Sequence, residues 1–142
     1  MKHRFPFACV LALVVTAFPA GADAPPGRYM VGSGTVYDAR TQLTWQQTPL
    51  ASSYNFANAT MQCALLGGAW RLPTRAELLT LVDPTLYNPA IDPVAFPSTP
   101  TTLFWTSSAR AGLTNYVWAV DFISGYSFAN DVSVTYRVRC VY

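Results

Sequence analysis

Two widely separated cysteines, Cys63 and Cys140, place the strongest limit on how this 142-residue chain can fold. The third cysteine, Cys9, lies in an apolar N-terminal stretch that is predicted to be removed. An exported chain that retains two cysteines most simply pairs them in an oxidising compartment, and the alternative is two free buried thiols. The pair would close a long loop, stabilise the fold by ~4 kcal/mol, and join the first predicted helix to the last predicted strand.

The N-terminus has the three parts of a secretory signal peptide. Residues 1–4 are basic, residues 5–18 are apolar, and Ala20-Gly21-Ala22 is a small-x-small cleavage signal. We expect a signal peptide over residues 1–22, because a cut two residues later would place Pro25 beside the scissile bond. The alternative is a retained anchor, for which the apolar run is short. The prediction is an exported protein without a membrane span, located in the periplasm, outside the cell or on its surface.

Removal of this leader takes away the only lysine, Lys2, and the only histidine, His3. Without Lys2 and Arg4, the nine basic residues become seven arginines, which balance seven acids. A neutral chain lacks the charge pattern of a nucleic-acid binder. Without histidine there is no Ser-His-Asp or Cys-His arrangement and no histidine metal site. The remaining option for catalysis is a pair of carboxylates that act as acid and base. We therefore expect that the protein is not an enzyme and that it binds neither a metal nor a cofactor.

Two short helices are predicted beside the strands. Ser52-Ser53 offers an N-cap for the first helix, whose apolar stripe includes Cys63 and which Gly67-Gly68 ends. The second helix is predicted over residues 75–82. It begins with a capping box in which Thr74 and Glu77 bind each other's backbone amides, next to Trp70.

The remaining pattern is strand and loop. Residues 35–38 and 43–46 read as a hairpin, and three further strands are predicted over 103–108, 116–122 and 136–142, with a short one at 126–128. Residues 23–33 read as a flexible lead-in, and the domain covers 34–142. Five prolines stiffen residues 83–102, which we expect to wrap the core and bury Leu86, Ile91 and Phe96. A functional loop is the alternative.

Six motifs in a fixed order resemble one family. They are D-x-x-T-x-L-x-W-Q from Asp38, a helical cysteine followed by Gly-Gly, W-R-L-P-T-x-x-E-L from Trp70, F-W-T-S-S from Phe104, W-x-V-D-F-x-x-G from Trp118, and V-R-C-V from Val138. This order is similar to the Lcl C-terminal domain family over residues 34–142. The resemblance implies an α+β, C-type lectin-like fold, with two short helices packed on twisted antiparallel sheets and one disulfide.

The resemblance also implies a function. Members are exported bacterial proteins, and the name-giving member is a collagen-like adhesin that binds sulfated glycosaminoglycans. This implies a non-catalytic binding module at the cell surface or in the periplasm, with a glycan or surface polysaccharide as partner. The alternative is a structural or oligomerising domain that binds a partner protein or its own copies. This chain has no collagen-like repeat and no lysine-rich surface.

Exposed arginines and tyrosines near the loops are the candidate binding residues, because arginine forks suit sulfate and carboxylate groups. The alternative, for each of them, is that the residue lies on a solvent-exposed strand face and binds no ligand. The candidates are Arg110, Tyr116, Arg137 and Arg139. All four tryptophans are expected in the core, namely Trp45, Trp70, Trp105 and Trp118. Asn130-Asp131 resembles part of a lectin calcium site but is expected to form a turn, because six or more oxygen ligands cannot be assembled around it.

Overall fold

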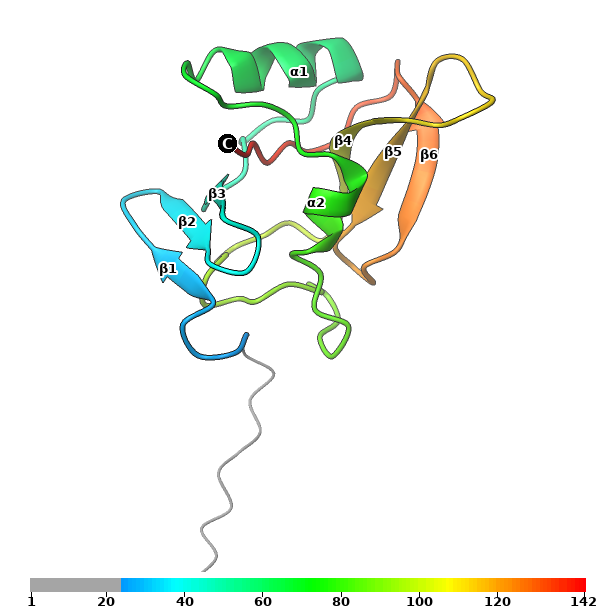
Figure 1. Ribbon diagram of the computed structural model, residues 1–142. Coiled ribbons are helices and arrows are strands. Elements are labelled where there is room, and N and C mark those ends of the chain that lie inside the picture. Colours follow the sequence, from blue (N-terminus) through cyan, green and yellow to red (C-terminus); the bar gives the residue numbers. More distant parts are fainter. Residues whose placement is uncertain (1–23) are drawn as a thin grey trace, which may run out of the picture.

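The computed structural model describes residues 24–142, so the expected signal peptide lies outside the described residues. The domain contains two three-stranded antiparallel sheets and two short helices (Figure 1). The first sheet has the order β1-β2-β3 and the second β4-β5-β6. The elements are β1 (Tyr29–Val31), β2 (Thr35–Asp38), β3 (Leu43–Gln46), α1 (Phe56–Ala64), α2 (Arg75–Leu79), β4 (Leu103–Ala109), β5 (Tyr116–Asp121) and β6 (Ser127–Asp131). This is the α+β architecture that the sequence predicts.

The first sheet contains the predicted hairpin and one further strand. β2 and β3 pair as expected, with Val36 opposite Trp45 and both side chains fully buried. The expectation of a flexible lead-in over 23–33 is wrong for β1, which pairs with β2 in antiparallel register. Arg28 holds this strand in place, because its guanidinium forms an ion pair with the buried Asp38 at 3.0 Å. A three-residue strand is too short to give a pattern in the sequence.

The two helices form where they are predicted, with different ends. The first helix, α1, is capped by Asn55 rather than by Ser52-Ser53, and the Asn55 side chain accepts a hydrogen bond from the Asn58 amide. Gly67 and Gly68 follow α1 with φ angles of +78° and +59°, which glycine adopts readily. The second helix, α2, has the predicted capping box but ends at Leu79 instead of residue 82.

The C-terminal segment, residues 136–142, lies at the centre of the domain rather than at a sheet edge (Figure 1). It is extended, but it makes only isolated bridges, so the expectation of a regular final strand is wrong. Val141 bridges to Trp45 on one side and to Arg71 on the other. The predicted disulfide between Cys63 and Cys140 is confirmed, and it links α1 to this segment.

The core has two parts. One lies between the first sheet, α2, the loop over residues 83–102 and one face of the second sheet. The other lies between α1, the other face of the second sheet and the C-terminal segment. The loop is irregular and buries Ile91 and Phe96 completely, as predicted, whereas Leu86 is half-buried. Within residues 24–142, no helix is long and apolar enough to cross a membrane.

Candidate functional site

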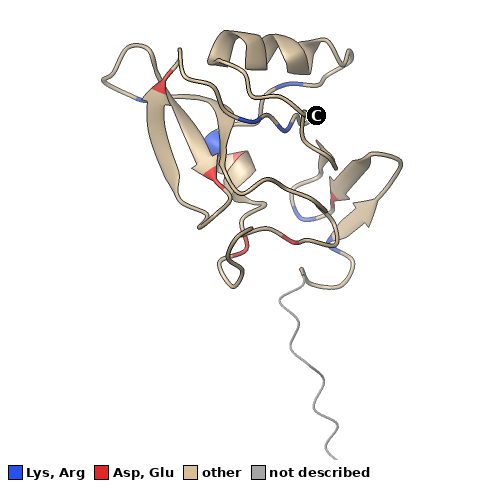
Figure 2. Cartoon of the chain, turned by 180° about the vertical axis from the view of Figure 1, so that it is seen from behind, with Lys and Arg blue, Asp and Glu red and all other residues tan. Residues whose placement is uncertain are grey.

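An open depression of about 410 Å³ lies where α2 meets the second sheet, and we call it the Arg75 surface. Its lining comes from α2, the end of β4 and the middle of β5. The residues are Arg75, Ala76, Leu79, Ser108, Ala109 and Trp118. Few charged residues lie on the described domain, and one of its arginines, Arg75, lines this depression (Figure 2).

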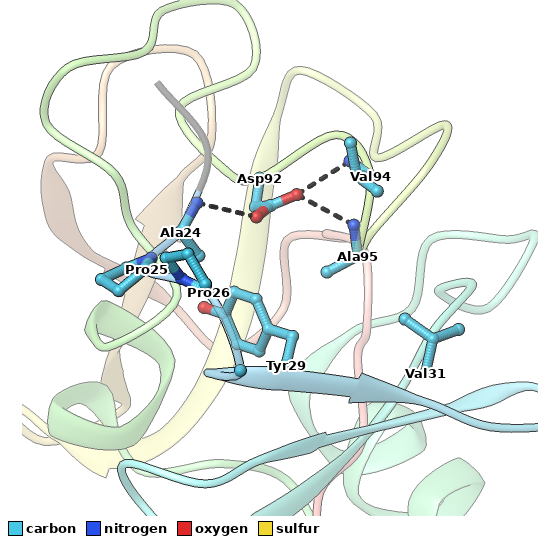
Figure 3. A pocket seen from close by; sticks show the side chains of 9 residues that line it. Ala24, Pro25, Pro26, Tyr29, Val31, Asp92, Val94 and Ala95 are labelled. Atoms are coloured by element: carbon cyan, nitrogen blue, oxygen red, sulfur yellow. Dashed lines mark hydrogen bonds between the residues drawn. The ribbon is translucent and has the colours of Figure 1, made fainter. Parts of the chain in front are cut away.

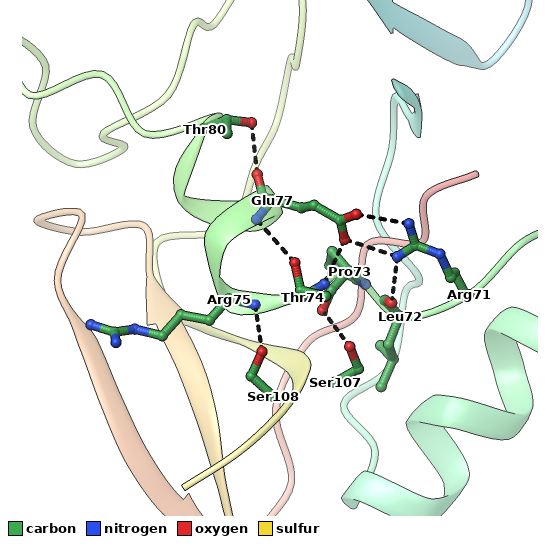
Figure 4. Close-up of polar contacts among 9 residues, drawn as sticks. All are labelled: Arg71, Leu72, Pro73, Thr74, Arg75, Glu77, Thr80, Ser107 and Ser108. Carbon is green, nitrogen blue, oxygen red and sulfur yellow. Dashed lines mark hydrogen bonds and ion pairs between the residues drawn. The ribbon is translucent and has the colours of Figure 1, made fainter. Parts of the chain in front are cut away.

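Arg75 is held in position by three contacts. Its backbone amide donates to Ser108 Oγ at 2.9 Å, and its Nε donates to Ser127 Oγ at 2.8 Å. Its guanidinium carbon lies 4.2 Å from the centre of the Trp118 ring, a cation–π distance. The side chain points away from the rest of the helix corner, over the strands of the second sheet (Figure 4). Within residues 24–142, its two terminal nitrogens have no hydrogen-bond acceptor.

Two of the four candidate residues lie beside this surface. The guanidinium of the exposed Arg110 lies 6.0 Å from the Trp118 ring, and the Arg110 amide donates to the Tyr116 carbonyl at 2.8 Å. Tyr116 is half-buried at the start of β5. No carboxylate of the described chain pairs with Arg75 or Arg110. Two arginines without a counter-ion therefore meet at one indole ring.

The other two candidate residues lie elsewhere. Arg137 is half-buried and donates to the Ala51 carbonyl. The expectation that Arg139 is exposed is wrong, because it is fully buried. Arg139 donates to the carbonyls of Gln46 and Gln47 at 2.8 and 2.6 Å, and to Thr99 Oγ1 at 2.7 Å. It connects β3 to the proline-rich loop.

The tryptophans divide into two classes. Trp45 and Trp105 are fully buried, as predicted. Trp70 and Trp118 are half-buried and belong to the linings of surface depressions, so the core assignment holds for them only in part. The sequence pattern does not indicate Trp118 as a surface residue, because it lies on the same strand face as the buried Val120. It does not indicate Arg75 either, because that residue is a first-turn position beside the helix cap.

The acids of the described chain all have structural partners. Each accepts hydrogen bonds from nearby amides, hydroxyls or arginines, which leaves none as a solvated pair at a cleft. They are Asp38, Glu77, Asp83, Asp92, Asp121 and Asp131. The expectation that Asn130-Asp131 forms a turn is wrong, because both residues lie in β6, where they pair with Val117 and Tyr116 of β5. Asp131 accepts from the amide and hydroxyl of Ser133, in the turn that follows the strand. Residues 24–142 contain no group of three or more acids, cysteines or histidines placed to hold a metal.

A smaller pocket of about 190 Å³ lies between the lead-in and the proline-rich loop (Figure 3). Its one carboxylate, Asp92, is almost fully buried and accepts from the amides of Ala24, Val94 and Ala95. The ring of Tyr29 in the same pocket has the Arg28 guanidinium 4.5 Å from its centre. The Asp92 carboxylate already has three donors, so it fastens the lead-in to the loop and is not free for a ligand.

The helix corner next to the Arg75 surface is fixed by ionic contacts (Figure 4). Arg71 donates from both terminal nitrogens to the Glu77 carboxylate at 2.8 Å, and Glu77 also accepts from the Thr74 amide at 2.7 Å. The hydrogen bonds from Arg71, followed by those from Thr74, lower the pKa of Glu77 to about 2. Glu77 therefore sets the angle at which α2 presents Arg75.

This arrangement predicts a loss of stability in acid. The folded-state pKa of Glu77 is depressed, so its contribution is complete above its unfolded pKa of 4.5 and is lost as the pH falls toward 2. Because the ion pair is partly solvated, we expect Glu77→Gln to cost about 1 kcal/mol at pH 6. Urea denaturation at pH 6, 4 and 2.5 should show the difference from wild type shrinking with pH. A difference that stays constant would contradict this role.

The fold and surface define a disulfide-linked α+β domain whose acids hold its turns and whose arginine surface faces solvent. The chain belongs to the Lcl C-terminal domain family, whose model matches residues 34–142. No curated protein matches the chain.

Proposed function

We propose that this domain is an exported, non-catalytic binding module that recognises an anionic glycan through the Arg75 surface. The observation that carries the proposal is the pair of arginines at Trp118. Their guanidinium carbons lie 4.2 and 6.0 Å from the same ring, and neither has a carboxylate partner in the described chain. A guanidinium fork suits a carboxylate or sulfate group, and the indole ring and Ser127 hold the Arg75 guanidinium in a defined place.

The hydrogen bonds made by the aspartate and glutamate side chains support the proposal that the domain is not a catalyst. General acid–base chemistry needs a carboxylate that can reach a substrate proton. Asp38 accepts from Arg28 and Arg40, and Asp121 accepts from Ile123 and Ser124. Glu77 is held by Arg71 and Thr74. These groups are committed to the fold, whereas the arginines at Trp118 are available for a ligand.

Replacing both surface arginines should weaken glycan binding. We expect Arg75→Gln/Arg110→Gln to raise the Kd for heparin and polygalacturonate oligosaccharides by at least about tenfold, or ~1.4 kcal/mol. Wild-type affinity should fall with added salt, because the contacts are ionic. Isothermal titration of the purified protein at two salt concentrations measures both effects.

Arg40→Gln is the control. Arg40 is also an exposed arginine, but it donates to the Thr80 carbonyl and does not belong to the Arg75 surface. It should change the Kd less than twofold. If Arg40→Gln, which removes one charge, lowers the binding free energy half as much as the double variant, which removes two, the effect is one of overall charge. The absence of binding in wild type, together with a defined oligomer in light scattering, would favour the alternative of a structural or oligomerising domain. That alternative has one supporting observation, the open sheet edge at β1 with Met30 and Val31 exposed.

A further inference from the structure

A second open depression, of about 470 Å³, lies between the turn that follows α1 and the C-terminal residue. We call it the aromatic platform. Its lining contains two aromatic rings, an exposed leucine, two hydroxyls and a glycine pair but no charged side chain. The residues are Thr35, Leu66, Gly67, Gly68, Ala69, Trp70 and Tyr142. It shares no residue with the Arg75 surface.

The two aromatic rings form the wall of this platform. The ring centres of Trp70 and Tyr142 lie 4.6 Å apart, and the ring planes meet at 73°. An edge-to-face pair of this kind keeps both rings in fixed orientation. Tyr142 is 49 % exposed and Trp70 is half-buried. Within residues 24–142, the Trp70 indole N–H and the hydroxyls of Tyr142 and Thr35 have no hydrogen-bond partner, so all three are available to a ligand.

The glycine turn leaves room above these rings. Gly67 and Gly68 have positive φ angles, and a Cβ placed on either would meet no atom within 4 Å. A ligand can therefore approach the backbone of the turn closely. Flat apolar rings beside hydroxyl and N–H groups match a pyranose ring, which has one C–H face and a rim of hydroxyls.

We propose that the aromatic platform binds an uncharged sugar ring of an oligosaccharide. The absence of arginine and other charged side chains from the lining distinguishes it from the Arg75 surface, for which we propose an anionic ligand. Both walls are fixed in advance, because Arg71 and Val141 exchange backbone hydrogen bonds at 2.9 and 3.0 Å beside Trp70 and Tyr142. The Cys63–Cys140 disulfide lies a few residues before each wall. A pre-formed site loses less entropy on binding.

Neutral oligosaccharides provide the test. Cellotetraose and chitotetraose, titrated into the purified protein and followed by calorimetry and tryptophan fluorescence, should bind with an affinity that does not change between low and high salt. Trp70→Ala and Tyr142→Ala should each raise the Kd at least about tenfold. Trp70→Phe should retain part of the affinity, because a smaller ring remains in place.

Two controls keep this result separate from the proposed function. Tyr126→Ala removes a tyrosine that is 70 % exposed outside the platform, and it should leave the Kd unchanged. Arg75→Gln/Arg110→Gln should also leave neutral-sugar binding unchanged, even if it abolishes binding of anionic glycans. Thermal melting confirms that each variant is folded. The proposal is overturned if neither oligosaccharide binds at millimolar concentration, or if folded Trp70→Ala binds as tightly as wild type.

Discussion

Cys63→Ala/Cys140→Ala is expected to lower the free energy of unfolding by about 4 kcal/mol and the Tm by roughly 15 °C. The disulfide closes a loop with a sequence separation of 77 residues, and its removal restores the conformational freedom of that loop to the unfolded chain. Both cysteines are fully buried, and they join α1 to the C-terminal segment at the centre of the domain. Urea denaturation of the purified protein, followed by circular dichroism, measures the change.

Wild-type protein unfolded and refolded in dithiothreitol is the control, because it keeps both sulfur atoms but loses the bond between them. It should be destabilised nearly as much as the double variant, since the lost cross-link and not the lost packing dominates. If the reduced protein unfolds at the same urea concentration as the oxidised one, the cross-link contributes little.

Arg139→Met is expected to destabilise the domain by about 3 to 5 kcal/mol. The substitution removes the donors to the Gln46 and Gln47 carbonyls and to Thr99 Oγ1, and each buried group left without a partner costs ~1–3 kcal/mol. Burial lowers the pKa of Arg139, and no carboxylate in residues 24–142 forms an ion pair with it. The ring of Phe96 lies 4.7 Å from its guanidinium and supplies a cation–π contact instead.

Arg110→Met is the matched variant, because it makes the same chemical change at an exposed position and should alter stability by less than about 0.5 kcal/mol. Arg139→Lys should fall between the two, since one ammonium cannot serve three separated acceptors. Chemical denaturation of all three variants tests this order. An Arg139→Met protein as stable as wild type would mean that the freed acceptors find other donors.

Local rules predicted the parts of the fold that local interactions determine. The capping box from Thr74 to Glu77, the hairpin that buries Val36 and Trp45, and the glycine pair after α1 each depend on neighbours in sequence. The disulfide followed from the number of cysteines, and the family followed from the order of motifs.

The C-terminal segment could not be read in this way. In an extended segment, the Arg139 side chain points to the face opposite that of its neighbours Val138 and Cys140. With the apolar face buried, this alternation predicts that Arg139 is exposed. The segment is instead covered on both sides, and the acceptors for Arg139 come from β3 and from the proline-rich loop. Alternation reports the direction of a side chain, but it does not report whether another part of the chain covers it.

The candidate site was predicted only in part for a related reason. Arg110 and Tyr116 lie beside the Arg75 surface, but its central residues are Arg75 and Trp118. Trp118 reads as core because it alternates with Val120. On the face of β5 that carries Val120, the packed core ends at this residue, and the Trp118 ring on the same face has the Arg75 guanidinium over it.

The position of residues 138–141 also determines when the domain can fold. These residues are synthesised after every element that they join, and they supply Val138, Arg139, Cys140 and Val141 to the interior. Contacts between residues this distant in sequence also form slowly, because a long loop must close before they can stabilise the fold. The two parts of the core can therefore be completed only after residues 138–141 have been synthesised, because Val141 belongs to one part and Val138 and Cys140 belong to the other.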